Sequence, residues 1–190
     1  MSSHHIVREK QEPALLIAGL DNFSDELLGQ LLEWSPTVVV TADTAEQVQA
    51  YGIKIDWLVA DEMIDLQQSD IKLVPAAEDK PVITALKQLA SEGYHAVNLV
   101  TDNFSADDFA GCFEQLDLVV FYEGKKIIAV HPGFSKWKPA GDRMEFLTQP
   151  NNFLYTGLLP AGDNVYKTTH DGFISLQFTN PYLLVAEYLD

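Results

Sequence analysis

Residues 36–65 constrain the fold of this chain more than any other stretch, because they hold two short apolar runs separated by a helical segment. Residues 37–40 are rich in β-branched side chains, and residues 57–59 form the second apolar run. Between them, residues 44–51 have helical spacing, and Gly52 ends the segment. This order of strand, helix and strand is typical of a parallel α/β sheet.

An aspartate follows each of these apolar runs, Asp43 after the first and Asp61 after the second. Ligands of parallel α/β sheets bind outside the carboxyl ends of the strands, and carboxylate oxygens are preferred by hard cations. The two aspartates are therefore candidate ligands for a divalent cation. The alternative is that both act as helix caps or turn residues, which is a common role of aspartate.

The alternation of strand and helix extends over residues 14–122. We expect further strands at 14–20, 71–74, 96–100 and 116–122, and further helices at 25–34, 80–91 and 106–115. This pattern predicts an α/β fold with a Rossmann-like, doubly wound, mostly parallel sheet and helices on both faces.

Helical periodicity does not resume after Tyr122. Short strands separated by Asn, Pro, Gly and Asp predict an antiparallel sheet or small β-sandwich. We expect its strands at 143–147, 153–159, 164–169, 173–179 and 182–189. The predicted organisation is a flexible N-terminal tail at 1–13, an α/β domain at 14–130, a Pro- and Gly-rich linker at 131–142, and an antiparallel β domain at 143–190.

The formal net charge of −16 argues against nucleic acid or an anionic membrane as the partner. No apolar run is long enough to span a membrane, and the N-terminus lacks the apolar region of a signal peptide. The single cysteine, Cys112, cannot form an internal disulfide, and we expect it to be a buried apolar residue. These features predict a cytoplasmic protein.

A local group of basic residues contrasts with the negative net charge of the chain. This basic island places five of the chain's 12 lysines and arginines within residues 125–143, namely Lys125, Lys126, Lys136, Lys138 and Arg143. It is a candidate phosphate site, and the alternative is a solvated linker with ordinary surface lysines. Trp137 lies within the island and is a candidate for stacking on a ligand. The common P-loop, GxGxxG, GxSxG, CxxC and HExxH motifs are absent.

The order of the two halves and a few motif residues resemble the thiamine pyrophosphokinase (thiamine diphosphokinase) family. Asp43 is kept from the family's ADGGAN motif, whereas both glycines are replaced. Residues 48–58, VQAYGIKIDWL, are similar to the family's LLELGIxPDLI. Asp61 is kept from the GDFDS motif, but Met63 stands at the second aspartate, and Asp65 is the candidate substitute.

Two further motifs are kept only in part. The family's KDxTD corresponds to residues 77–81, where Pro81 replaces the last aspartate, Lys80 stands at the threonine, and Asp79 lies beside them. From GGRxDH only Asp108 is kept, and the arginine and histidine are missing. A weak match to the family's GxSN element ends at Ser175 near the C-terminus.

This resemblance implies Mg²⁺-dependent transfer of diphosphate from ATP to thiamine, in a homodimer with thiamine at the subunit interface. The implied roles are catalytic for Asp61 and Asp108, metal-binding for Asp43, Asp61, Asp65 and Asp79, phosphate-binding for Lys80, Lys125 and Lys126, and substrate-binding for Ser175 and Trp137.

The missing motif residues leave other functions open. Loss of one catalytic charge commonly lowers a rate by about 10²–10³. One alternative is therefore a non-catalytic divergent member that binds a thiamine-like molecule or a nucleotide. Another is a pterin diphosphokinase-type enzyme, which shares the strand–Asp pattern but not the all-β C-terminal third.

Overall fold

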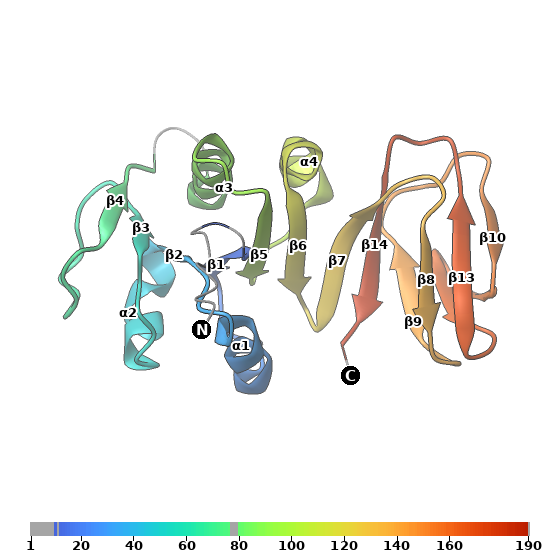
Figure 1. Ribbon diagram of the computed structural model, residues 1–190, viewed down its shortest axis with the longest axis horizontal. Helices are drawn as coiled ribbons and strands as arrows, with labels where there is room; N and C mark the ends of the chain where they lie inside the picture. The colour runs from blue at the N-terminus through green and yellow to red at the C-terminus, as the bar shows by residue number, and fades with distance from the viewer. Residues whose placement is uncertain (1–9, 11, 77–79, 190) are drawn as a thin grey trace, which may run out of the picture. The chain divides into compact units, whose positions relative to one another are not determined.

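The computed structural model describes residues 10, 12–76 and 80–189. The chain forms two compact units, Met1–Leu118 and Val119–Asp190 (Figure 1). The tail predicted at 1–13 lies mostly outside the described residues. Within the part of the chain that the structure describes, no helix is long and apolar enough to cross a membrane.

The first unit is built on parallel strands in the order β5-β1-β2-β3-β4. Most side chains of β1, β2 and β3 are buried, as expected for parallel strands with both faces covered. The strands are β1 (Ala14–Ala18), β2 (Val38–Thr41), β3 (Trp57–Val59), β4 (Lys72–Val74) and β5 (Ala96–Thr101).

Four helices cover these strands, α1 and α2 on one side and α3 and α4 on the other (Figure 1). Ser24 caps the first helix, because its Oγ accepts a hydrogen bond from the Leu27 N–H at 3.2 Å. Pro81 occupies the first turn of the third helix, where its missing N–H costs nothing. The helices are α1 (Asp25–Leu32), α2 (Ala42–Ala50), α3 (Pro81–Ser91) and α4 (Ala106–Gln115). The predicted mixed α/β class is confirmed.

The second unit contains antiparallel strands in two sheets, ordered β11-β12-β9-β14-β7-β6 and β10-β13-β8. The strands of the first sheet are β6 (Asp117–Tyr122), β7 (Lys125–Val130), β9 (Arg143–Phe146), β11 (Leu158–Gly162), β12 (Val165–Thr168) and β14 (Leu183–Tyr188). Those of the second sheet are β8 (Ser135–Lys138), which lies inside the predicted linker, β10 (Leu154–Thr156) and β13 (Gly172–Gln177).

A hydrophobic core in this unit gathers side chains from both sheets. Phe146 packs edge-on against Phe153 and Tyr166, with ring centroids 5.0 and 5.1 Å apart. The buried members of the core are Val130, Met144, Phe146, Leu158, Ile174, Leu176, Phe178, Leu183 and Val185.

Two lysines of the basic island form ion pairs with Glu187 of β14, which is a buried charged residue. Lys136 Nζ donates to both carboxylate oxygens of Glu187 at 2.8 Å. Lys138 Nζ lies 3.2 Å from Glu187 Oε1 and 3.2 Å from Asp142 Oδ2. Both Glu187 and Lys138 are buried. The two lysines are on β8 and the glutamate is on β14, so the pairs link the two sheets.

Burial raises the pKa of Glu187, but the hydrogen bond from Lys136 and the charges of both lysines outweigh it, so this pKa lies below its ordinary value of 4.5. A carboxylate with a lowered pKa stabilises the fold above its unfolded pKa and ceases to do so as the pH falls through the folded one.

We expect Glu187→Gln to lower the free energy of unfolding at neutral pH by about 3 kcal/mol, because the buried Lys138 then has only Asp142 as a carboxylate partner and Lys136 loses Glu187. The variant should also lose less stability than the parent between neutral pH and about pH 4. Urea denaturation of both proteins measures the two effects. Asp163→Asn, at an exposed carboxylate of the same unit, is the control and should match the parent. Equal stability of Glu187→Gln and the parent at neutral pH would contradict this account.

Candidate functional site

The carboxyl ends of β2 and β3 carry the two aspartates that the sequence singled out. The strands are parallel neighbours, and their register aligns Thr41 with Val59. Asp43 lies two residues beyond Thr41, and Asp61 lies two residues beyond Val59. Both aspartates are exposed. The register thus places the residues that follow the two strands, Asp43 and Asp61 among them, at the same edge of the sheet.

Local structure fixes the backbone of Asp43. It lies in the first turn of α2, where a negative charge is favoured by the helix dipole. Thr44, the next residue, donates its hydroxyl to the carbonyl of Ile17 at the end of β1, 2.8 Å away. The start of α2 is therefore tied to the neighbouring strand end.

The segment after β3 holds Asp61 and Asp65, and both are exposed. Met63, between them, is 54% exposed. The segment is anchored farther along, where the Gln68 side chain accepts from the Ile55 N–H at 2.9 Å and donates to the Ile53 carbonyl at 3.0 Å. The predicted metal ligand Asp79 lies outside the described residues.

A third strand end contributes a carboxylate that the sequence analysis missed. Asp102 directly follows β5, which pairs with β1 so that Ala18 aligns with Thr101. Its Oδ2 accepts from the Asp21 N–H at 3.3 Å. It packs directly on Gly19, where a Cβ would overlap the carboxylate and lie 2.5 Å from the Asp102 nitrogen. The position of Asp102 after an apolar strand was the signal that could have found it.

We call Asp43, Asp61 and Asp102 the carboxylate edge, because they follow β2, β3 and β5 at one end of the parallel strands. Carboxylate oxygens suit Mg²⁺ chemically. Within the described ranges, no three His, Cys, Asp or Glu side chains are already arranged to hold a metal ion.

The structure brings together two predicted site residues that are 28 positions apart. Lys80 Nζ lies 2.6 Å from Asp108 Oδ2, and the side chains are 69% and 39% exposed. Lys80 directly precedes α3, and Asp108 lies in the first turn of α4. At this exposure the ion pair contributes little to stability. Its effect is to give Asp108 a cationic partner.

The other predicted phosphate ligands belong to the second unit. Lys125 is half-buried, and its Nζ lies 2.8 Å from Glu145 Oε2. The hydrogen bond to Glu145 raises the pKa of Lys125. Lys126 is its neighbour on β7. Lys125 is therefore already paired, and phosphate would have to compete with Glu145 for it.

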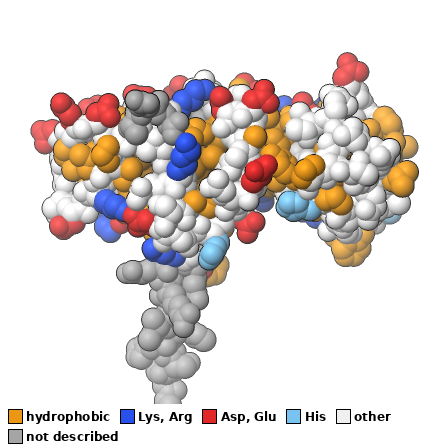
Figure 2. Space-filling model, turned by 90° about the horizontal axis from the view of Figure 1, so that it is seen from above, with side chains coloured by type: hydrophobic (Ala, Val, Ile, Leu, Met, Phe, Trp, Pro, Cys, Tyr) orange, Lys and Arg blue, Asp and Glu red, His pale blue; other side chains and the backbone are white. Residues whose placement is uncertain are grey.

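The two predicted substrate contacts, Ser175 and Trp137, lie in the sheet β10-β13-β8. Ser175 Oγ lies 2.7 Å from Thr156 Oγ1. Trp137 is 53% exposed and pairs in register with Phe173, which is 68% exposed. Strand alternation places Trp137, Phe173 and Ser175 on the face of this sheet opposite to the buried Ile174 and Leu176. Figure 2 shows hydrophobic side chains at the surface of the second unit.

Comparison with solved structures shows the fold. A probable thiamine pyrophosphokinase from Staphylococcus saprophyticus matches with a TM-score of 0.68 and 13% identity, over 94% of this chain and 99% of that chain. A thiamin pyrophosphokinase from Geobacillus thermodenitrificans matches with a TM-score of 0.69 and 11% identity, over 93% and 98%. The yeast enzyme matches with a TM-score of 0.67 and 7% identity, over 96% and 88%.

No protein-family model and no curated protein sequence matches the chain. The chain has the fold of the thiamine pyrophosphokinases, at low sequence identity. The resemblance inferred from its sequence is thus confirmed at the level of the fold.

We expect Gly19→Ala to lower the free energy of unfolding by about 1–3 kcal/mol, because the new methyl group must displace Asp102. Gly29→Ala is the matched control, since open space surrounds that helical glycine, and it should stabilise the protein by up to about 1 kcal/mol. Urea denaturation of the two variants gives both values. Equal stability of Gly19→Ala and the parent would mean that Asp102 does not pack on Gly19 as described.

Proposed function

We propose that this protein is a thiamine pyrophosphokinase-type diphosphotransferase, which takes diphosphate from ATP and gives it to thiamine, with activity weakened by its altered motifs. The observation that carries the proposal is the placement of Asp43 and Asp61 two residues beyond the aligned ends of β2 and β3. The fold shared with thiamine pyrophosphokinases supports it. The first unit serves as a doubly wound, nucleotide-binding domain, and ligands of such domains bind at this edge.

The acidic residues fit Mg²⁺ in a particular way. Mg²⁺ is commonly bound by one or two protein carboxylates together with substrate phosphates, rather than by a cage of protein ligands. Asp43 and Asp61 would supply those carboxylates, with Asp65 as a further oxygen donor. This mode needs no preformed cluster of three acidic side chains. When bound, the metal would neutralise charge on the phosphates of ATP.

The remaining groups act on phosphate and on the acceptor. In the reaction, the thiamine hydroxyl oxygen bonds to the β-phosphorus of ATP, the bond from that phosphorus to the oxygen bridging the α- and β-phosphates breaks, and AMP leaves. Lys80 donates to phosphate oxygens in place of Asp108. Asp108, released from Lys80, accepts the proton of the hydroxyl. Asp102, whose Oδ2 accepts from the Asp21 N–H, lies at the same strand ends.

A non-catalytic role is the second candidate, and two observations favour it. Met63 occupies the position of an acidic motif residue and cannot bind a hard cation, and it is largely exposed. Lys80 pairs with Asp108, so the candidate base is already partnered. In this case the fold would bind thiamine or a nucleotide without turnover.

We expect the purified protein to release AMP from ATP in the presence of thiamine and Mg²⁺, and Asp61→Asn to lower this rate by about 10²–10³. Asp43→Asn should act in the same direction. Glu46→Gln, an exposed carboxylate one turn from Asp43, is the control and should keep the parental rate. Calorimetric titration of thiamine on the same samples separates binding from turnover. Thiamine binding without AMP release would select the non-catalytic candidate, and an unchanged rate in Asp61→Asn would contradict the proposed site.

The proposal includes a homodimer that buries the outer face of the sheet β10-β13-β8. Trp137, Phe173 and Leu154 of that face are 53%, 68% and 71% exposed. Exposed apolar side chains gathered on one face commonly mark an interface. Thiamine would bind at this interface, next to Ser175.

We expect sedimentation velocity to show a dimer for the parent and a monomer for Trp137→Glu, because a buried unpaired charge is strongly unfavourable at an interface. Leu159→Glu, at a 59% exposed apolar residue of β11 in the other sheet, should stay dimeric. A monomeric parent would rule out the homodimer.

A further inference from the structure

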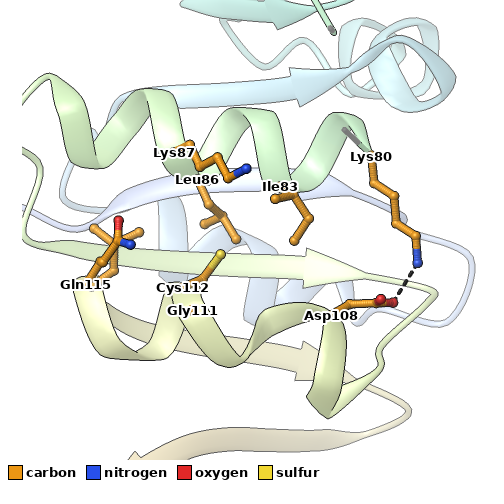
Figure 3. Close-up of a pocket in the computed structure, with 9 residues that line it drawn as sticks. Lys80, Ile83, Leu86, Lys87, Asp108, Gly111, Cys112 and Gln115 are labelled. Carbon is orange, nitrogen blue, oxygen red and sulfur yellow. Dashed lines mark hydrogen bonds and ion pairs between the residues drawn. The ribbon is translucent and has the colours of Figure 1, made fainter. Parts of the chain in front are cut away.

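A groove between α3 and α4 shares Lys80 and Asp108 with the proposed reaction site, contains none of the three aspartates of the carboxylate edge, and has the composition of a ligand site. It has a volume of about 470 Å³, within the range of small-molecule pockets. Figure 3 shows Ile83 and Leu86 of α3 and Cys112 of α4 pointing into the space between the two helices. Leu86 and Cys112 are buried, so the floor of the groove is apolar.

The rim of the groove is charged, and its charge is unusual for this protein. Lys80 and Lys87 line it from α3, and Asp108 is the acidic residue that lines it. The groove therefore presents two lysine side chains in a chain whose formal net charge is −16. The two lysines are two helical turns apart, roughly 10 Å along the helix axis.

We propose that this groove binds a small amphiphilic carboxylate, with the hydrocarbon part on Leu86, Cys112 and Leu116 and the carboxylate on Lys80. Lys80 already holds a carboxylate, that of Asp108, at 2.6 Å, so its ammonium is placed to accept such a partner. The ligand exchanges with Asp108 at this end of the groove. The remaining length of the groove, from Ile83 to Gln115, accommodates the hydrocarbon part of the ligand.

Gly111 keeps the groove open. It lies on α4 and lines the groove, and no atom lies within 4 Å of the position that its Cβ would occupy. A side chain introduced here enters the groove without a clash and with improved helix propensity. Gly29 of α1 is the matched control, because it is also helical, exposed and surrounded by open space.

Octanoate is the probe, and Cys112 is the reporter because it is the only cysteine and lies on the floor of the groove. We expect octanoate to slow modification of Cys112 by N-ethylmaleimide saturably in the full chain. Butyrate should bind far more weakly, because each buried methylene contributes roughly fourfold in affinity. Gly111→Phe should abolish the effect of octanoate, and Gly29→Phe should retain it, with circular dichroism confirming that both variants are folded.

Two charge variants should change the affinity for octanoate in opposite directions. Lys80→Met should weaken octanoate binding by up to about fivefold, and Asp108→Asn should strengthen it by a similar factor, because Asp108 competes for Lys80. Calorimetric titration of octanoate measures both. The proposal is overturned if octanoate leaves the modification rate of the parent unchanged, or if Gly111→Phe and Gly29→Phe respond to it equally.

Discussion

Parallel pairing of β1, β2, β3 and β5 is the constraint on which the rest of the first unit depends. β1, β2 and β3 are short and almost wholly buried, so their register is fixed by packing on both faces. Because the strands are parallel, the residues that follow them gather at one edge. This geometry, rather than contacts between their side chains, explains the common position of Asp43, Asp61 and Asp102.

The sequence predicted the local elements well, because strand and helix periodicities are carried by neighbouring residues. Asp43 and Asp61 could be assigned to strand ends in this way. The basic island shows what could not be predicted. Lys136 and Lys138 bind Glu187, about 50 positions away, and only tertiary structure brings the three together. The Lys80–Asp108 pair is a second long-range contact, which depends on where α3 and α4 begin.

The fold and the candidate site depend on the sequence in different ways. The fold depends on apolar patterning, which survives many substitutions, so it matches thiamine pyrophosphokinases at 7–13% identity. The candidate site depends on single charges. Met63 matters most chemically, because it stands where the resembled motif has an aspartate and it cannot bind a hard cation. The chain has carboxylates at paired strand ends, and Lys80 and Lys125 are paired with Asp108 and Glu145. The proposed chemistry therefore requires Mg²⁺ to enter the site bound to ATP. It also requires a phosphate of ATP to displace Asp108 from Lys80.

Paramagnetic broadening of amide resonances by Mn²⁺, used in place of Mg²⁺, tests the central claim most directly. The titration is made with and without a non-hydrolysable ATP analogue. The account predicts weak broadening by the metal alone and strong broadening near Asp43 and Asp61 once the nucleotide is present. Strong broadening confined to other regions, or none near these two aspartates with the nucleotide bound, would contradict the carboxylate edge as the site of metal and phosphate binding.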